Sequence, residues 1–169
     1  MTPLQLADWR DFYVMIGTAS GAIVGASFIV ASLATGVKER GLGMRGFISP
    51  TTVHLASVLV ASAILSVPKV PAAAIALLLG GGGVAGTIYG ILVVTRLWRL
   101  KLAIEDWCFY ALLPIMAYAA LPAAAVMIVT GVDSPLYVLA AALILLLIIG
   151  MRNAWDMATF FIMRDRESQ

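Results

Sequence analysis

The chain of 169 residues has few charged side chains, one cysteine and one histidine. Charged residues make up 12% of it, about half of the roughly 25% found in soluble domains. Cys108 alone excludes a disulfide within the chain, and His54 alone excludes a metal site built from several histidines of one chain. A formal net charge of +2 is too small to indicate a nucleic-acid partner. We therefore expect no cofactor, no bound metal and no nucleic acid.

Hydrophobic residues take the place of the missing charges. They make up 62% of the chain, and the mean hydropathy is +1.01. Five membrane spans of about 20 residues each need roughly 100 apolar positions, and this composition supplies them. The composition excludes an ordinary soluble enzyme. It predicts an all-α, polytopic bundle of five transmembrane helices.

Apolar runs and turn residues mark where the spans lie. Ser49 and Ser134 each stand directly before a proline, as a helix cap stands before the first turn. Pro68 and Pro71 predict a tight turn between two spans. The predicted spans cover residues 12–35, 50–67, 72–95, 107–130 and 135–163. The outer turns are short, so residues 1–169 should form one transmembrane domain in which spans 2 and 3, and spans 4 and 5, are antiparallel hairpins.

Lysine and arginine predict the orientation, because they concentrate on the cytoplasmic side of a membrane. With five spans, Arg10 and Lys69 lie on one side and the other nine basic residues lie opposite. These nine are Lys38, Arg40, Arg45, Arg96, Arg99, Lys101, Arg152, Arg164 and Arg166. We therefore expect the N-terminus outside and the C-terminus in the cytoplasm.

Glycine recurs every four residues in two spans. The first series is Gly17, Gly21 and Gly25, and the second is Gly82, Gly86 and Gly90. Lipid provides no hydrophobic drive for helix association, so small residues that let backbones approach predict tight crossings. These crossings can form within one chain or between copies, and we expect a homo-oligomer.

Four consecutive glycines, Gly80, Gly81, Gly82 and Gly83, fall near the middle of the third span. Each costs up to about 1 kcal/mol relative to alanine in a helix interior. The run therefore predicts either a broken helix or a very close neighbour. A broken helix would expose backbone carbonyls to a cavity or a cation, as in some transporters.

Polar side chains in two spans are the main candidates for a site, and His54 and the polar residues of the fifth span lie near the cytoplasmic boundary. They are His54, Ser57, Ser62 and Ser66 in the second span and Arg152, Asn153 and Asp156 in the fifth. Ionisable groups inside a membrane are costly and indicate function by default. His54, Arg152 and Asp156 form either a relay for protons or cations or a structural network that ties helix ends, and for these three residues we favour the structural network. In both, His54 lies at a depth where it can contact Asp156.

Two acidic residues, Asp8 and Asp11, stand just before the first span on the outer side. In a symmetric oligomer they would recur as an acidic ring that attracts cations. Carboxylates are also favourable near a helix N-terminus, which explains the pair equally well.

Ser20 in the first span and His54 in the second raise the question of an intramembrane serine hydrolase. On the predicted spans, the two residues differ in depth by more than about 10 Å. A nucleophile and its base need to lie about 3 Å apart. We therefore expect no catalytic dyad and no enzyme.

Two prolines in the fourth span, Pro114 and Pro122, should each kink the helix and free a backbone carbonyl. Tyr110 and Tyr118 lie on a nearby face, and their hydroxyls need partners at membrane depth. The freed carbonyls are the simplest partners.

Three short motifs carry a resemblance to a known group of proteins. They are Trp9-x-x-Phe12-Tyr13, Phe47-Ile48-Ser49-Pro50-Thr51-Thr52-Val53-His54 and Arg152-Asn153-Ala154-Trp155-Asp156. Together they resemble a group of small bacterial inner-membrane proteins, some of which are described as modulators of a membrane protease. The resemblance spans the whole chain and implies an inner-membrane location and five helices, with no established activity.

Two functions follow as hypotheses. The first is a homo-oligomeric channel or carrier for ions or small solutes, lined by the polar side of the second span and the glycine run of the third. The second is a non-catalytic accessory subunit that packs against a larger membrane complex. We favour the channel slightly, because the hydroxyls and His54 exceed what packing requires. If the serines of the second span bond only to their own helix, the accessory subunit is favoured instead.

Overall fold

A computed structural model describes residues 6–33, 42–98 and 104–167, and its regular elements in these ranges are all helical. The helices are α1 (Leu6–Leu33), α2 (Leu42–Ser66), α3 (Ala72–Leu97), α4 (Ile104–Trp107), the π-helix η2 (Cys108–Leu112), α5 (Leu113–Thr130) and α6 (Pro135–Glu167). The segments α4, η2 and α5 follow one another without a break and form one continuous helical rod. We use the word rod for this unit and for each of α1, α2, α3 and α6. Five rods therefore make up the described part of the bundle.

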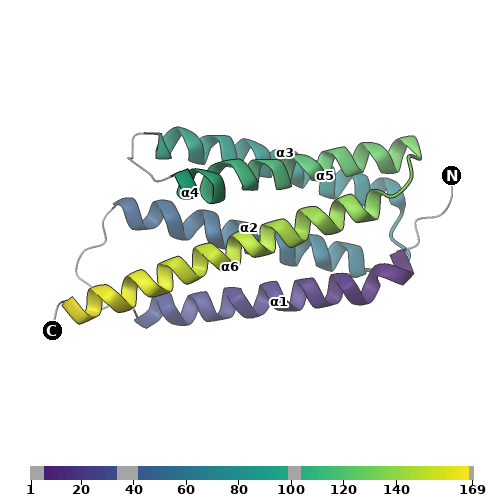
Figure 1. Cartoon of the computed structure of the whole chain (residues 1–169). Coiled ribbons are helices and arrows are strands. Elements are labelled where there is room, and N and C mark those ends of the chain that lie inside the picture. The colour runs from purple at the N-terminus through teal and green to yellow at the C-terminus, as the bar shows by residue number, and fades with distance from the viewer. Residues whose placement is uncertain (1–5, 34–41, 99–103, 168–169) are drawn as a thin grey trace.

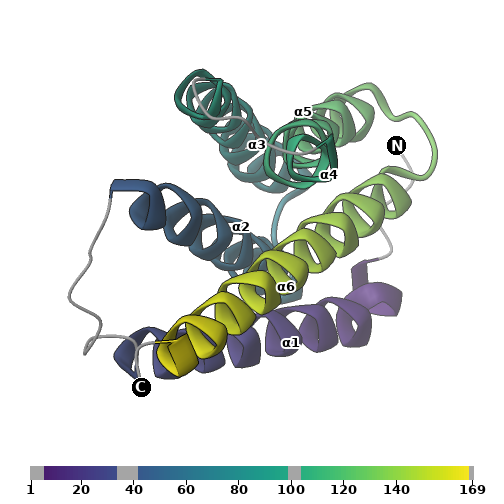
Figure 2. The ribbon, with the colours of Figure 1, turned by 60° about the vertical axis from the view of Figure 1, so that its left-hand side comes forward.

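The five rods alternate in direction, so the two ends of the chain lie at opposite ends of the bundle (Figure 1). Helices α1, α2 and α6 pack against one another, and α3 packs chiefly against α5. The contact between α5 and α6 joins these two groups. Helices α2 and α3 are joined by a short turn yet share few contacts, and they diverge beyond it (Figure 2). The predicted hairpin of spans 2 and 3 is therefore splayed.

Four of the rods are long and apolar enough to cross a membrane. They are Leu6–Ile29, Ala72–Thr95, Ile104–Thr130 and Pro135–Thr159, and α2 contributes the shorter apolar stretch Pro50–Ser66. Large apolar side chains also cover the outside of the bundle. Leu77 is 75% exposed, Phe28 64% and Val129 63%. Such a surface fits hydrocarbon rather than water, so the chain is a helical membrane protein.

Two predicted helix starts differ from the structure. Helix α1 begins at Leu6 rather than near Phe12, and α2 begins at Leu42 rather than at Pro50. Helix α2 continues through Pro50, although a proline removes one backbone donor and its ring crowds the carbonyl four residues earlier. In contrast, α6 begins at Pro135, as predicted. Four of the nine predicted cytoplasmic basic residues, Lys38, Arg40, Arg99 and Lys101, lie outside the described residues.

Helix α3 is continuous through Gly80–Gly83, so the predicted broken helix is wrong. The second explanation for the run, a close neighbour, fits two of the four glycines. A Cβ at Gly80 would lie 2.9 Å from Ala125 Cβ, and one at Gly83 would lie 2.6 Å from Leu121 Cβ. Both neighbours belong to α5. The glycines thus let α3 and α5 approach closely.

The other glycines of the two predicted series differ in their surroundings. A Cβ at Gly17 would lie 2.9 Å from Ser62 Cβ, whereas one at Gly21 would be in ordinary contact with Leu59. Gly86 lies directly against the ring of Tyr118, and Gly90 lies against Ile115. No atom of the described residues lies within 4 Å of such a Cβ at Gly25 or Gly82, so neither glycine is a packing contact within the described part of the bundle.

The predicted distortion at Pro114 takes the form of a π-helical turn. The Leu113 N–H donates to the Cys108 carbonyl, five residues back, instead of four. A proline cannot donate to the preceding turn, and the wider turn before it accommodates this loss. The rod ends at Gly131, whose φ of 71° forms a left-handed cap.

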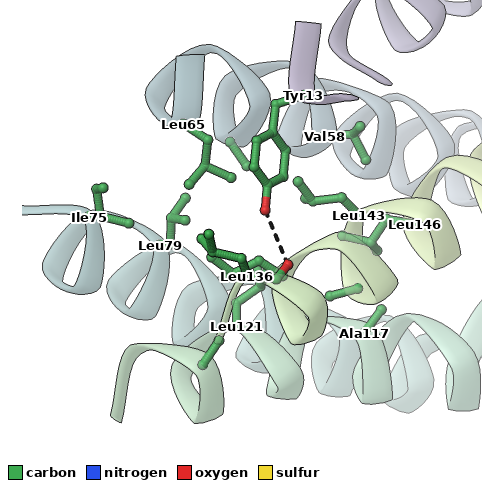
Figure 3. Close-up of a cluster of buried hydrophobic side chains, with 14 of the residues drawn as sticks. Tyr13, Val58, Leu65, Ile75, Leu79, Ala117, Leu121, Leu136, Leu143 and Leu146 are labelled. Atoms are coloured by element: carbon green, nitrogen blue, oxygen red, sulfur yellow. Dashed lines mark hydrogen bonds between the residues drawn. The ribbon is translucent and has the colours of Figure 1, made fainter. Parts of the chain in front are cut away.

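The core lies where all five rods converge, with α3 contributing Ile75, Ala76 and Leu79. Fully buried Leu and Ile side chains fill it, together with Tyr13, whose hydroxyl donates to the Leu136 carbonyl at 3.2 Å (Figure 3). This bond ties α1 to the first turn of α6. The ring of Trp9 packs edge-on against Tyr137 at the same end. Aromatic side chains therefore fasten the end of the bundle at which α1 begins.

Candidate functional site

A chain of hydrogen bonds joins α2 to α5 in the middle of the bundle. His54 Nδ1 lies 3.0 Å from Tyr118 Oη, and Tyr118 Oη donates to Ser57 Oγ at 3.1 Å. Ser57 Oγ donates in turn to the Val53 carbonyl at 2.8 Å. His54 and Tyr118 are each 1% exposed. His54 and Ser57 come from one face of α2, because three residues separate them.

The direction of these bonds follows from counting hydrogens. The single hydrogen of Tyr118 goes to Ser57, so Tyr118 Oη accepts from His54, and His54 carries its proton on Nδ1. This tautomer is assigned from the partners. His54 Nε2 is then a buried lone pair without a hydrogen-bond partner. An unpartnered acceptor costs less than an unpartnered N–H group in the same position, which favours this arrangement.

The hydrogen-bonded chain forms part of the wall of a groove between α2 and α3. The groove has a volume of about 310 Å³. Its lining residues are Val53, Ala56, Ser57, Val60, Ala61, Ile64, Leu78, Leu79, Gly82, Tyr118 and Leu121. Val60 is 57% exposed and Leu78 52%, so they form the rim, and Leu79, Tyr118 and Leu121 are buried and form the floor. The groove opens sideways because α2 and α3 diverge.

The remaining serines of the predicted polar path do not line this groove. Ser66 donates to the Ser62 carbonyl of its own helix. Ser62 is 1% exposed, packs against Gly17 of α1, and its hydroxyl has no hydrogen-bond partner. Of the three predicted path serines, Ser57 lines this groove and the other two do not.

Ser20 lies closer to His54 in depth than the sequence indicated. Its hydroxyl donates to the Leu55 carbonyl at 2.6 Å, which places Ser20 at the level of the residue next to His54. The predicted depth difference of more than about 10 Å is therefore wrong. The reason is that α1 and α2 both extend further than the predicted spans. Even so, no hydrogen bond joins the two side chains among the described residues, since Ser20 bonds to Leu55 and His54 bonds to Tyr118.

Arg152 and Asp156 of α6 belong to a separate cluster, which α6 forms with α4 and η2. The guanidinium of Arg152 lies 3.5 Å from Glu105 and 3.8 Å from Asp156, and 3.9 Å above the ring of Phe109. Within the described residues, no hydrogen bond or ion pair joins His54 to Asp156. Spacing within α2 does not distinguish Tyr118 from Asp156 as the partner of His54, because the partner depends on how α5 packs.

Asn153 of α6 is fully buried, at 0% exposure, and within the part of the chain that the structure describes neither polar atom of its amide has a hydrogen-bond partner. Asp8 and Asp11 are exposed on the first turns of α1. No group of three His, Cys, Asp or Glu side chains that could hold a metal ion occurs among the described residues.

The sequence analysis missed Tyr118 as a member of the site. It assigned the Tyr118 hydroxyl to a carbonyl freed by proline, whereas its partners are His54 and Ser57 of α2. A phenol at the middle of an apolar span was the available signal, since such a group needs a partner. Comparison with protein families, curated proteins and solved structures finds no match to this chain.

Proposed function

We propose that this chain is a non-catalytic protein of the bacterial inner membrane that binds a lipid hydrocarbon chain in the groove between α2 and α3. The groove itself is the observation that carries the proposal. Its walls are apolar apart from Ser57 and Tyr118, and its rim lies on the outside of the bundle. We further propose the orientation that the basic residues predict, with the N-terminus outside.

The depth of the groove supports a hydrocarbon occupant. Ser57 stands seven residues after Pro50 and nine before Ser66 in the apolar part of α2. At 1.5 Å per residue, it lies about 10 Å from one end and about 13 Å from the other. A groove at this depth opens into the acyl-chain region of a bilayer, which is roughly 30 Å thick. Lipid chains are the molecules present there at the highest concentration.

The size of the groove suits a hydrocarbon chain. The groove has a volume of about 310 Å³, which is near the lower limit of small-molecule sites. A flexible hydrocarbon chain can adapt its shape to so narrow a groove.

The bonding of the serines of α2 bears on the two hypotheses from the sequence. Ser57 and Ser66 donate to carbonyls of their own helix, and Ser62 packs against α1. A path for ions needs polar groups that face a shared opening. This pattern supports a non-transporting protein, and the accessory subunit remains compatible with lipid binding in the groove.

Adjacent glycines of α3 provide a matched test. Gly81 and Gly82 are both exposed with no atom within 4 Å of an added Cβ, but only Gly82 lines the groove. Native mass spectrometry of the purified protein should show bound phospholipid in wild type and in Gly81→Leu. Gly82→Leu should lose most of it, because the leucine fills the groove. Equal lipid retention by the two variants would contradict the proposal.

A further inference from the structure

We infer, resting on the proposed function, that the preferred occupant of the groove is an acyl chain carrying a hydroxyl group near its middle. The floor of the groove is not uniformly apolar. Tyr118 of the floor and Ser57 of the wall both line the groove, and each side chain carries a hydroxyl group. A plain hydrocarbon chain would cover these oxygens without bonding to them.

The hydrogens of both hydroxyls are already committed. Tyr118 donates to Ser57, and Ser57 donates to the Val53 carbonyl. Each oxygen accepts one bond, from His54 and from Tyr118 respectively, and a hydroxyl oxygen has two lone pairs. One lone pair therefore remains on each oxygen. The floor can accept a further hydrogen bond, but it cannot donate one without breaking a bond it already makes.

This polarity selects the ligand chemistry. A ligand hydroxyl can donate to Ser57 or Tyr118 while the existing chain stays intact. A ketone or an ester oxygen can only accept, so it needs Ser57 to leave the Val53 carbonyl or Tyr118 to leave Ser57. A ligand hydroxyl in the surrounding hydrocarbon has no hydrogen-bond partner. In the groove it regains the hydrogen bond that it lost on leaving water.

The depth of the floor selects where along the chain the hydroxyl stands. Ser57 lies about 10–13 Å from the two ends of the apolar part of α2. The headgroup of a lipid stays at the membrane surface, so the matching hydroxyl must be mid-chain. A long-chain alcohol, whose hydroxyl is itself the headgroup, does not reach the floor.

Three fatty acids with one chain length test this inference. They are octadecanoate, 12-hydroxyoctadecanoate and 12-oxooctadecanoate, offered in competition to the delipidated protein in dodecylmaltoside and measured by native mass spectrometry. We expect the hydroxy acid to bind about three- to tenfold more tightly than the other two, which is the effect of one net hydrogen bond. Ser57→Ala and Tyr118→Phe should each reduce this preference, and the double variant should abolish it.

The outcomes separate the inference from the proposed function. Equal binding of all three acids, or tightest binding of the oxo acid, overturns the inference and leaves the groove proposal standing. Binding that is unchanged in Gly82→Leu overturns both. The thermal transition of each variant is measured alongside. If Tyr118→Phe does not fold, the loss of preference in Ser57→Ala decides, since Ser57 is only partly buried.

Discussion

Replacing Gly83 by alanine should destabilise the contact between α3 and α5, although alanine is the better helix former. A Cβ at Gly83 would lie 2.5 Å from Pro122 Cδ, 2.6 Å from Leu121 Cβ and 2.8 Å from the Tyr118 carbonyl oxygen. None of these atoms is the end of a flexible side chain. One belongs to a rigid ring, one is a Cβ, and one is backbone. The two helices must therefore move apart.

The sign of the effect depends on two opposing magnitudes. Alanine in place of glycine stabilises a helix by about 0.5–1 kcal/mol. Overpacking a close contact costs typically about 1–3 kcal/mol. For Gly83→Ala the second effect is larger, and we expect a net loss of about 1–2 kcal/mol in the free energy of unfolding.

Gly81→Ala is the matched control, because it makes the same chemical change two residues away. A Cβ at Gly81 meets no atom within 4 Å, so only the helix-forming gain of up to about 1 kcal/mol remains. The assay is reversible unfolding in mixed micelles with increasing dodecyl sulfate, followed by far-ultraviolet circular dichroism. The reasoning is refuted if Gly83→Ala proves as stable as Gly81→Ala.

Two further predictions concern the helix packing and the topology. Ser20→Ala removes the buried bond from α1 to the Leu55 carbonyl and should cost about 0.5–1.5 kcal/mol. Ser27→Ala, whose hydroxyl bonds only to the Ile23 carbonyl of its own helix, should change stability by less than about 0.5 kcal/mol. An equal loss in both would show that the interhelical bond contributes nothing. Reporter tags on the two termini should appear in opposite compartments, because the five rods alternate in direction; tags in one compartment would disprove this topology.

The existence of the helices was predictable from local features of the sequence. Long apolar runs predict helices in a membrane because backbone groups in lipid must bond within their own segment. Gly131 and Pro135 mark a helix end and a helix start in the structure, as they do in the sequence. The starts at Leu6 and Leu42 were not predictable in the same way. The residues at these two starts are less apolar than the rest of the helices. Pro50 stands inside α2, but in the sequence it resembles the proline of a first helical turn.

The candidate site was only partly predictable. His54 and the serines around it predicted that a polar site lies on α2. They did not predict that Tyr118 is the partner of His54. The groove was not predictable at all. The groove exists because α3 packs chiefly on α5, whereas α2 packs on α1 and α6. The spacing of residues within one helix does not predict which helices pack together.

The chain alone therefore determined a helical membrane protein, because apolar length and the demand for internal backbone bonding are local properties. Tertiary packing decided which glycines lie at a contact between two helices and which lie against no other helix. Gly82 and Gly83 are neighbours in one helix, but Gly83 lies against α5 and Gly82 lines the groove. Adjacent residues of a helix point about 100° apart, so their surroundings depend on where the other helices lie.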